Sequence, residues 1–140
     1  MRIRWLGLAL VVVGTLAFAA CGGGGNGGDT GGDTGNDTGT ITINAPSGAA
    51  NTGFEPASIT VPAGAAFTLR FVNDDGGIPH NVQIFEGADA TGTPVFAPEG
   101  NELITGVAEA DYRVPALPAG TYTFNCLAHP ATMVGTLTAG

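Results

Sequence analysis

The chain has 140 residues with twelve acidic and only four basic side chains, so its formal net charge is −8. Nucleic acid binding relies on lysine and arginine contacts to phosphates, and this charge therefore argues against a nucleic acid partner. An acidic surface suits docking to a basic protein partner, and it equally serves solubility.

The first twenty residues predict an export signal. Arg2 and Arg4 supply a positive start, and residues 5–17 form an apolar run that is short for a membrane span. We predict a signal peptide at residues 1–20 and an exported protein, located in the periplasm or at another extracytoplasmic face. Its removal leaves two arginines against twelve acids, a net charge of −10.

Residues 18–21, Phe-Ala-Ala-Cys, resemble a bacterial lipobox, in which the cysteine is lipidated and becomes the mature N-terminus. Phe18 stands where the lipobox usually has leucine. We predict lipidation of Cys21 and contact with the membrane through this lipid anchor only; simple secretion and an uncleaved anchor are the alternatives. If Cys21 carries lipid, Cys126 has no disulfide partner.

Residues 22–40 contain only glycine, asparagine, aspartate and threonine. Such a stretch lacks the apolar side chains of a core, so we predict a disordered tether over residues 21–40 that begins at the lipidated cysteine. As a flexible coil it would span roughly 25 Å. Calcium binding by its aspartates is a weaker alternative, because the glutamate and loop geometry of calcium motifs are missing.

Residues 41–140 are long enough for one compact domain. Large side chains alternate with polar ones at 67–71 and 121–126, as in strands with one buried face. Further short strands are expected at residues 41–44, 58–61, 80–85, 111–114 and 133–138. Turn sequences rich in proline, glycine and aspartate separate these runs, which predicts an all-β, antiparallel β-sandwich. Residues 87–109 fit no regular pattern, apart from a short helix near Glu99.

The soft metal ligands of the mature domain are one cysteine, two histidines and one methionine. Cys126, His129 and Met133 form a Cys-x2-His-x3-Met motif, and His80 lies far upstream at the start of a predicted strand. A thiolate and two imidazoles with a weak axial thioether are the ligands of a blue-copper electron-transfer site. We therefore predict one type 1 copper ion, held by these four side chains.

The spacing of the motif suits the predicted strands. Cys126 continues the inward-facing positions of its strand, Pro130 favours a turn after His129, and Met133 returns as the final strand begins. Three ligands on one loop between paired strands would be preorganised, and low reorganisation favours fast electron transfer.

Each ligand also has an ordinary structural interpretation. Taken singly, His80 suits a strand end, His129 a loop, Met133 a core position and Cys126 a small buried hydrophobe. The four together favour a metal site, because the mature domain contains no other histidine, cysteine or methionine.

Four stretches of the domain carry a family resemblance. They are FEPASITVPAG at residues 54–64, NDD at 73–75, PHNV at 79–82 and LPAGTYTFNCLAHPATMVGTL at 117–137. Together they resemble the cupredoxins of the plastocyanin, azurin and halocyanin type. The resemblance covers nearly all of residues 41–140 except the middle stretch, and its closing segment is the most specific part.

The resemblance implies a cupredoxin-like Greek-key β-sandwich in which His80 and His129 bind copper through Nδ1, Cys126 through its thiolate and Met133 weakly along the axis. It also implies that Asn81 forms a hydrogen bond that holds the cysteine loop. We assign Tyr122 a structural hydrogen bond of the kind found at sandwich corners. The spacing between the last histidine and the methionine resembles azurin, whereas the rest is more similar to plastocyanin.

The leading hypothesis is outer-sphere electron transfer through the exposed edge of His129. The edge would be surrounded by an apolar rim of Leu127, Ala128, Pro130, Ile78 and Pro79. We expect a monomer that exchanges electrons with a redox partner protein, such as a cytochrome or a membrane redox complex. An enzyme is not expected, because a second copper centre needs further histidines or a second loop cysteine. A copper carrier or sensor and a metal-free interaction domain are the alternatives.

Overall fold

The computed structural model describes residues 37–140, and every structural statement below concerns this part of the chain. The predicted signal peptide, Cys21 and most of the predicted tether lie outside the described residues. The elements in chain order are β1 (Asp37–Ala45), α1 (Ala49–Thr52), β2 (Ser58–Val61), β3 (Ala66–Asn73), β4 (Pro79–His80), β5 (Gln83–Glu86), the 3₁₀ helix η1 (Glu99–Asn101), β6 (Ile104–Thr105), β7 (Ala108–Val114), β8 (Gly120–Asn125) and β9 (Val134–Ala139).

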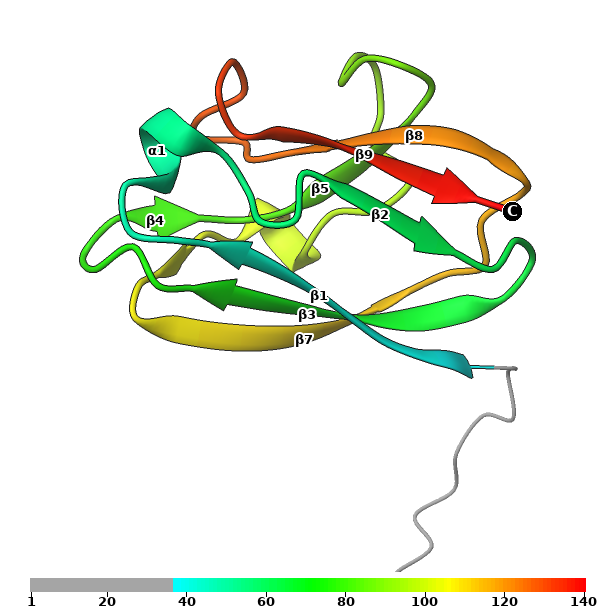
Figure 1. The fold of residues 1–140 in the computed structure, drawn as a ribbon, viewed down its shortest axis with the longest axis horizontal. Coiled ribbons are helices and arrows are strands. Elements are labelled where there is room, and N and C mark those ends of the chain that lie inside the picture. The colour runs from blue at the N-terminus through cyan, green and yellow to red at the C-terminus, as the bar shows by residue number, and fades with distance from the viewer. Residues whose placement is uncertain (1–36) are drawn as a thin grey trace, which may run out of the picture. The chain divides into compact units, whose positions relative to one another are not determined.

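Two β-sheets face each other across an apolar core (Figure 1). One sheet has the strand order β1-β3-β7 and the other β2-β9-β8-β5, while β4 and β6 form a short ladder of their own. Every second side chain of β9 is buried, as expected for a strand with one face on the core. The largest fully buried side chains are Phe67, Phe71 and Phe124. The predicted all-β sandwich is confirmed.

Two strand pairs run parallel, which corrects the expectation of a purely antiparallel sandwich. β1 pairs in parallel with β3, and β2 pairs in parallel with β9. The cause is the way in which the chain crosses between the layers. β2 lies in the sheet opposite β1 and runs the other way, so β3 returns beside β1 in the same direction (Figure 1).

The first strand begins earlier than predicted. β1 starts at Asp37 rather than at residue 41, so the last four residues of the predicted tether lie in a strand. Thr40 pairs with Thr68 of β3, and the hydroxyl of Thr38 donates to the carbonyl of Ala66. Threonine favours strands, and the edge of β3 supplies a partner.

The predicted strand at residues 80–85 is two strands in two different sheets. β4 pairs with β6, whereas β5 pairs with β8. The break falls at Asn81 and Val82, both buried, and the side chain of Asn81 bonds to the backbone of another loop there. A period-two pattern does not reveal such a change of sheet.

The helices are short. η1 lies where the short helix near Glu99 was predicted, and α1 was not expected, because its four residues have no side-chain cap. None of the helices in residues 37–140 is long and apolar enough to cross a membrane.

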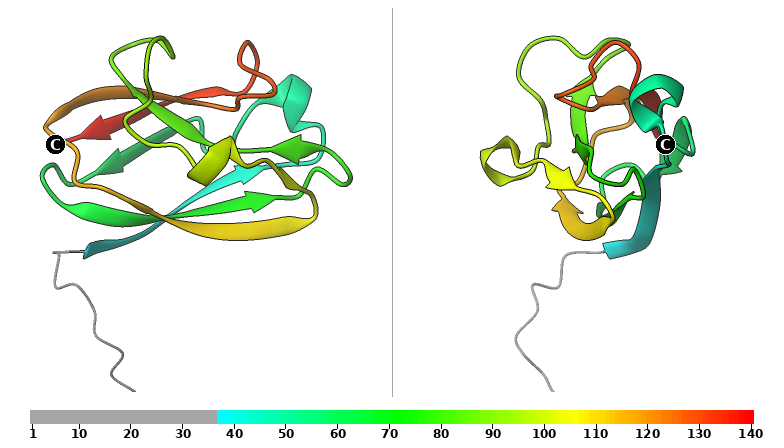
Figure 2. Two further views of the ribbon diagram at one scale, coloured as in Figure 1. Left: turned by 180° about the vertical axis from the view of Figure 1, so that it is seen from behind. Right: turned by 90° about the vertical axis from the view of Figure 1, so that its left-hand side faces the viewer.

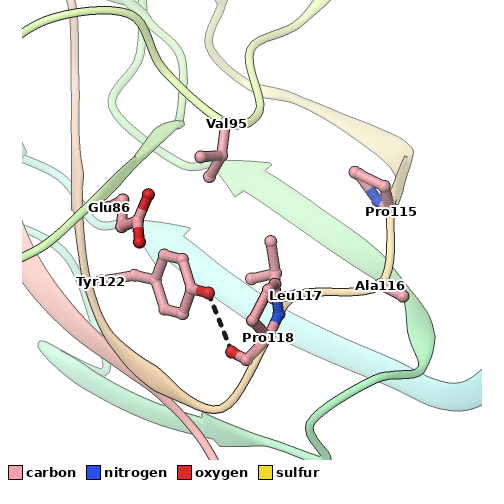
Figure 3. A pocket seen from close by; sticks show the side chains of 7 residues that line it. All are labelled: Glu86, Val95, Pro115, Ala116, Leu117, Pro118 and Tyr122. Atoms are coloured by element: carbon pink, nitrogen blue, oxygen red, sulfur yellow. Dashed lines mark hydrogen bonds between the residues drawn. The ribbon is translucent and has the colours of Figure 1, made fainter.

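A cavity of about 300 Å³ lies near the start of β8 (Figure 3). The hydroxyl of Tyr122 donates to the carbonyl of Pro118 at 2.8 Å, which is the structural bond predicted for this tyrosine. Tyr122 precedes Cys126 by four strand positions, or about 13 Å along the chain. This cavity therefore belongs to the end of β8 that is remote from the predicted ligands.

Candidate metal centre

The loop between β8 and β9 carries three of the four predicted ligands. Cys126 follows the last residue of β8, and Asn125 is paired with Val134, the first residue of β9. The N–H of Cys126 donates to the carbonyl of Met133 at 3.1 Å, and the N–H of Met133 donates to the carbonyl of His129 at 3.0 Å. The antiparallel pair and these bonds close the loop and fix the positions of all three residues.

His80 approaches the same point from a distant part of the sequence. It ends β4, where it pairs with Ile104 of β6, and its side chain is fully buried. Its Nδ1 lies 3.8 Å from the Sγ of Cys126. The short β4-β6 ladder thus holds the imidazole against the thiol.

His129 completes a cluster of three donor atoms. Its Nδ1 lies 3.9 Å from the Sγ of Cys126, and its ring centroid lies 4.8 Å from that of His80. The ligand atoms of His80, Cys126 and His129 all lie within 4.8 Å of one another. The cysteine and the first histidine are buried, whereas His129 is only half-buried.

Met133, the fourth predicted ligand, is fully buried in the same apolar cluster as Cys126. Its backbone bonds place it beside the two loop ligands. These contacts suit a core side chain and an axial ligand equally, so the ligand role of Met133 stays a prediction.

Asn81 connects the two segments that carry the ligands. Its buried Oδ1 accepts a hydrogen bond from the N–H of Leu127 at 2.9 Å. Leu127 follows Cys126, so this bond holds the start of the cysteine loop against the residue that follows His80. It is the contact that the family resemblance implies for Asn81.

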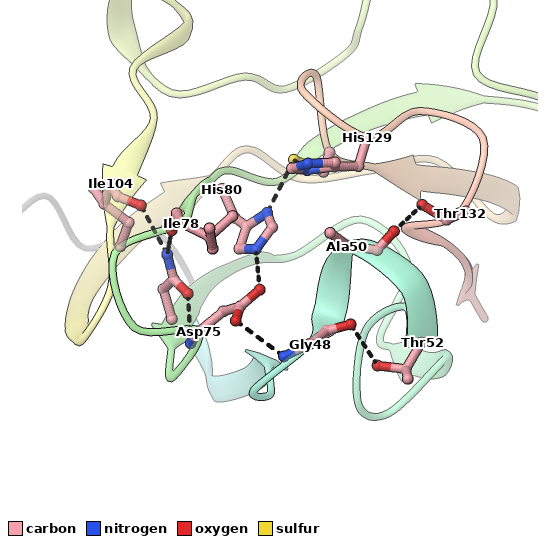
Figure 4. Close-up of polar contacts among 11 residues, drawn as sticks. Gly48, Ala50, Thr52, Asp75, Ile78, His80, Ile104, His129 and Thr132 are labelled. Carbon is pink, nitrogen blue, oxygen red and sulfur yellow. Dashed lines mark hydrogen bonds and ion pairs between the residues drawn. The ribbon is translucent and has the colours of Figure 1, made fainter.

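Asp75 is a neighbour of the cluster that the sequence analysis missed. Its Oδ2 lies 3.0 Å from the Nε2 of His80, and its Oδ1 accepts a hydrogen bond from the N–H of Gly48 at 2.9 Å (Figure 4). The bond from Gly48, and after it the bond to His80, hold the pKa of the Asp75 carboxyl below its usual value of 3.8. An acid in the turn before the predicted ligand strand was the only available signal.

The segment of α1 is hydrogen-bonded both to Asp75, which contacts His80, and to the loop that carries the other ligands. Gly48, the residue before α1, donates to Asp75, and the carbonyl of Ala50 accepts a hydrogen bond of 2.6 Å from the hydroxyl of Thr132. Thr132 precedes Met133 in the ligand loop. Two further views show α1 and this loop at the same end of the sandwich (Figure 2).

The donor set and its spacing fit a copper ion. A thiolate with two imidazoles is a combination that copper favours. Bonds with the lengths typical of zinc, about 2.3 Å to sulfur and about 2.0 Å to nitrogen, set about 120° apart, place the two ligand atoms about 3.7 Å from each other. The observed separations between Sγ and the two Nδ1 atoms are 3.8 and 3.9 Å.

Comparison with known proteins identifies the family. A family model described as a cupredoxin-like domain matches residues 8–139. Plastocyanin from Scenedesmus fuscus is 35% identical over 100 residues, which cover 71% of this chain and 96% of that protein. The chain belongs to the cupredoxin family. Its predicted function as a copper-binding electron-transfer protein with one type 1 copper ion is thereby confirmed.

Two further comparisons give the same result for this cupredoxin. Auracyanin-A from Chloroflexus aurantiacus is 38% identical over 90 residues, which cover 64% of this chain and 55% of that protein. The solved structure of auracyanin A, a blue copper protein from the same bacterium, superposes with a TM-score of 0.61 at 23% identity, over 74% of this chain and 99% of that one. At this identity the superposition supports the fold.

The five residues predicted to form an apolar rim around His129 are all exposed. Ile78 is 39% exposed and Leu127 is 47% exposed. The other predicted rim residues, Pro79, Ala128 and Pro130, are exposed as well. Three of the five, Leu127, Ala128 and Pro130, lie within two residues of His129 in the chain.

Proposed function

We propose that His80, Cys126, His129 and Met133 hold the copper ion of this cupredoxin and that the protein carries single electrons between protein partners without catalysing a reaction. The observation that carries the proposal is the convergence of one thiol and two Nδ1 atoms within 4.8 Å, from segments far apart in sequence. Their separations match those of two ligands on one metal ion.

When bound, copper supplies a one-electron centre that cycles between Cu(II) and Cu(I). The chain keeps its ligands in place during this change. Cys126 and Met133 are tied by a backbone bond just beyond the paired ends of β8 and β9, and His80 is fixed by the β4-β6 ladder and the contact with Asp75. A site that moves little between the two valences has a low reorganisation energy, which suits electron transfer.

His129 is the route by which a partner reaches the site. It is the one half-exposed member of the three-residue cluster, and Leu127, two residues before it, is exposed and apolar. An apolar contact can form and separate without the desolvation of charged groups. The acidic remainder of the surface would steer a basic redox partner, such as a cytochrome or a membrane redox complex.

The small number of possible metal ligands supports an electron-transfer protein rather than an enzyme. The chain has two histidines in total, and both belong to the cluster. A second copper centre would need further imidazoles or a second loop cysteine. Electron transfer needs one centre and an accessible ligand, and the cluster with its half-buried His129 supports that role.

The site would work outside the cytoplasm. The predicted signal peptide and lipobox support export, and lipidation of Cys21 would anchor a monomeric domain to a membrane in the periplasm or at another extracytoplasmic face. These segments lie outside the described residues, so Cys21→Ser provides the test. We expect the protein to move from the membrane fraction to the soluble fraction, and a variant that stays with the membrane would contradict lipid anchoring.

The copper site can be tested in the purified full-length protein by adding Cu(II). We expect an intense visible absorption from the thiolate and narrow hyperfine splitting in the electron paramagnetic resonance spectrum. Cys126→Ser should abolish both, whereas Cys21→Ser, the matched cysteine control, should keep both. Colourless wild-type protein, or colour that survives Cys126→Ser, would refute the assignment.

A further inference from the structure

Asp75 is a buried acid with one oxygen committed to each of two donors. The residue is 7% exposed, Oδ2 faces the Nε2 of His80 at 3.0 Å, and Oδ1 accepts from the N–H of Gly48 at 2.9 Å. A buried carboxylate that is bonded on both oxygens has a fixed orientation. The surrounding structure therefore keeps the Asp75 carboxylate pointed at His80.

The turn that carries Asp75 is itself held on several sides. The N–H of Asp75 donates to the side chain of Asn73, whose amide donates to the carbonyls of Ile78 and Ile104 at 2.9 and 2.8 Å. Gly106 packs so closely against the Asp75 backbone that a side chain would not fit there. These contacts fix the position of the Asp75 carboxylate before any metal binds.

The contact with Asp75 decides which nitrogen of His80 carries the hydrogen. A carboxylate can only accept, so the Nε2 of His80 must be the donor. In the neutral ring the Nδ1 then keeps its lone pair, and this atom faces the Sγ of Cys126 at 3.8 Å. The ring is thus oriented and in the correct tautomer for a metal between these two atoms.

On the basis of the proposed copper site, we propose that Asp75 is a positioning residue that presents the Nδ1 lone pair of His80 to copper and whose negative charge favours Cu(II) over Cu(I). The charge acts through the imidazole, because a carboxylate bonded to Nε2 makes the ring a stronger electron donor. A purely structural role, in which Asp75 only ties the turn to Gly48, would leave the copper potential unchanged.

Asp75→Asn and Asp74→Asn form a matched pair of variants. Both remove one negative charge from the same turn, but Asp74 is exposed and only Asp75 contacts His80. An asparagine at position 75 offers one acceptor oxygen to two donors, so it cannot reproduce both bonds. The reduction potential of each copper-loaded protein separates a contact effect from a general charge effect.

We expect Asp75→Asn to lower the preference for Cu(II) over Cu(I) about tenfold, which raises the reduction potential by about 59 mV. Its affinity for Cu(II) should fall at least about tenfold. Asp74→Asn should shift both quantities by much less. Equal shifts in the two variants, or no shift in either, would overturn the proposal.

A measurement on the metal-free wild-type protein tests the tautomer independently of copper and of any variant. Nitrogen chemical shifts of His80, recorded well above the ordinary histidine pKa of about 6.5, should show hydrogen on Nε2. Hydrogen on Nδ1 would overturn the proposal even if Asp75→Asn does not fold. Failure of the copper site itself would appear as wild-type protein without the blue absorption, which this measurement does not depend on.

Discussion

The two histidines of the cluster are built into the molecule in opposite ways. His80 is fully buried, and both of its ring nitrogens face fixed groups, Nε2 toward Asp75 and Nδ1 toward Cys126. His129 lies on the β8–β9 loop and is half-buried. Within residues 37–140, its Nε2 forms no hydrogen bond, and its Nδ1 faces the same sulfur.

This difference divides the site into a closed side and an open side. The closed side consists of His80, Asp75 and Asn81, all buried and bonded to other segments. The open side consists of His129 and the exposed Leu127. An electron carrier needs both, because a fixed ligand limits reorganisation whereas an accessible one lets a partner approach.

The two histidines should differ most in how much each stabilises the metal-free protein. His80→Ala removes a fully buried ring and should lower the free energy of unfolding by about 3 kcal/mol, because a cavity remains. His129→Ala removes a half-exposed ring and should lower it by about 0.5 kcal/mol. Urea unfolding without copper measures both values. Equal losses would show that the closed and open sides do not differ.

The β8-β9 pair is packed more tightly at the end near the ligands than at its other end. The ring of Phe124 lies where a side chain of Gly135 would be, and the carbonyl of Ala57 lies 2.8 Å from the same position. Gly135→Ala should therefore lower the free energy of unfolding by about 2 kcal/mol. Gly120→Ala, at the other end of the same strand pair, meets nothing closer than 3.7 Å and is the control. Similar denaturation midpoints for the two variants would contradict this packing.

A smaller effect is expected for the bond between the two ligand segments. Asn81→Ala leaves the N–H of Leu127 without its partner and should lower the free energy of unfolding by about 1.5 kcal/mol. It should also change the visible spectrum of the copper form, because the loop of Cys126 loosens. Gln83→Ala, which removes a buried amide bonded to Asn101 instead, should lose comparable stability and keep the spectrum. A changed spectrum in both variants would argue against a specific role for Asn81.

The smallest effect is expected far from both histidines. Arg70 and Asp111 form an exposed pair at 2.8 Å in the sheet that carries no ligand, and the arginine holds the pKa of Asp111 below 3.8. A lowered folded-state pKa contributes stability above the unfolded value, which is lost as the pH falls through the folded one. At neutral pH, Asp111→Asn should therefore be less stable than wild type. This difference in the free energy of unfolding should become smaller below about pH 4. If the stability difference between the two proteins instead grows as the pH is lowered, the pair does not stabilise the fold in the way proposed.

Much of the site could be predicted from the sequence because its information is local. Cys126, His129 and Met133 lie within one short loop, and period-two alternation identifies the strand that precedes it. The rarity of histidine and cysteine in the chain then adds His80 to the set. The overall sandwich follows from the same alternation.

What escaped prediction depends on contacts between distant segments. Asp75 looks like an ordinary turn acid until Gly48 and His80 are placed on either side of it. The four-residue helix that follows Gly48 has no side-chain cap from which it could have been predicted. Likewise, the parallel pairing of β1 with β3 results from the chain crossing between layers, which alternation along a single strand cannot show.

X-ray absorption at the copper edge of the oxidised full-length protein reports which atoms are bound to the metal, so it examines the proposed ligand set itself. The ligand set of Cys126, His80 and His129 predicts one short copper–sulfur bond and two imidazole nitrogens. The sulfur should disappear in Cys126→Ser, and one imidazole should disappear in each single histidine variant. Copper without a bound sulfur, or copper that keeps two imidazoles after either histidine is replaced, would contradict this ligand set.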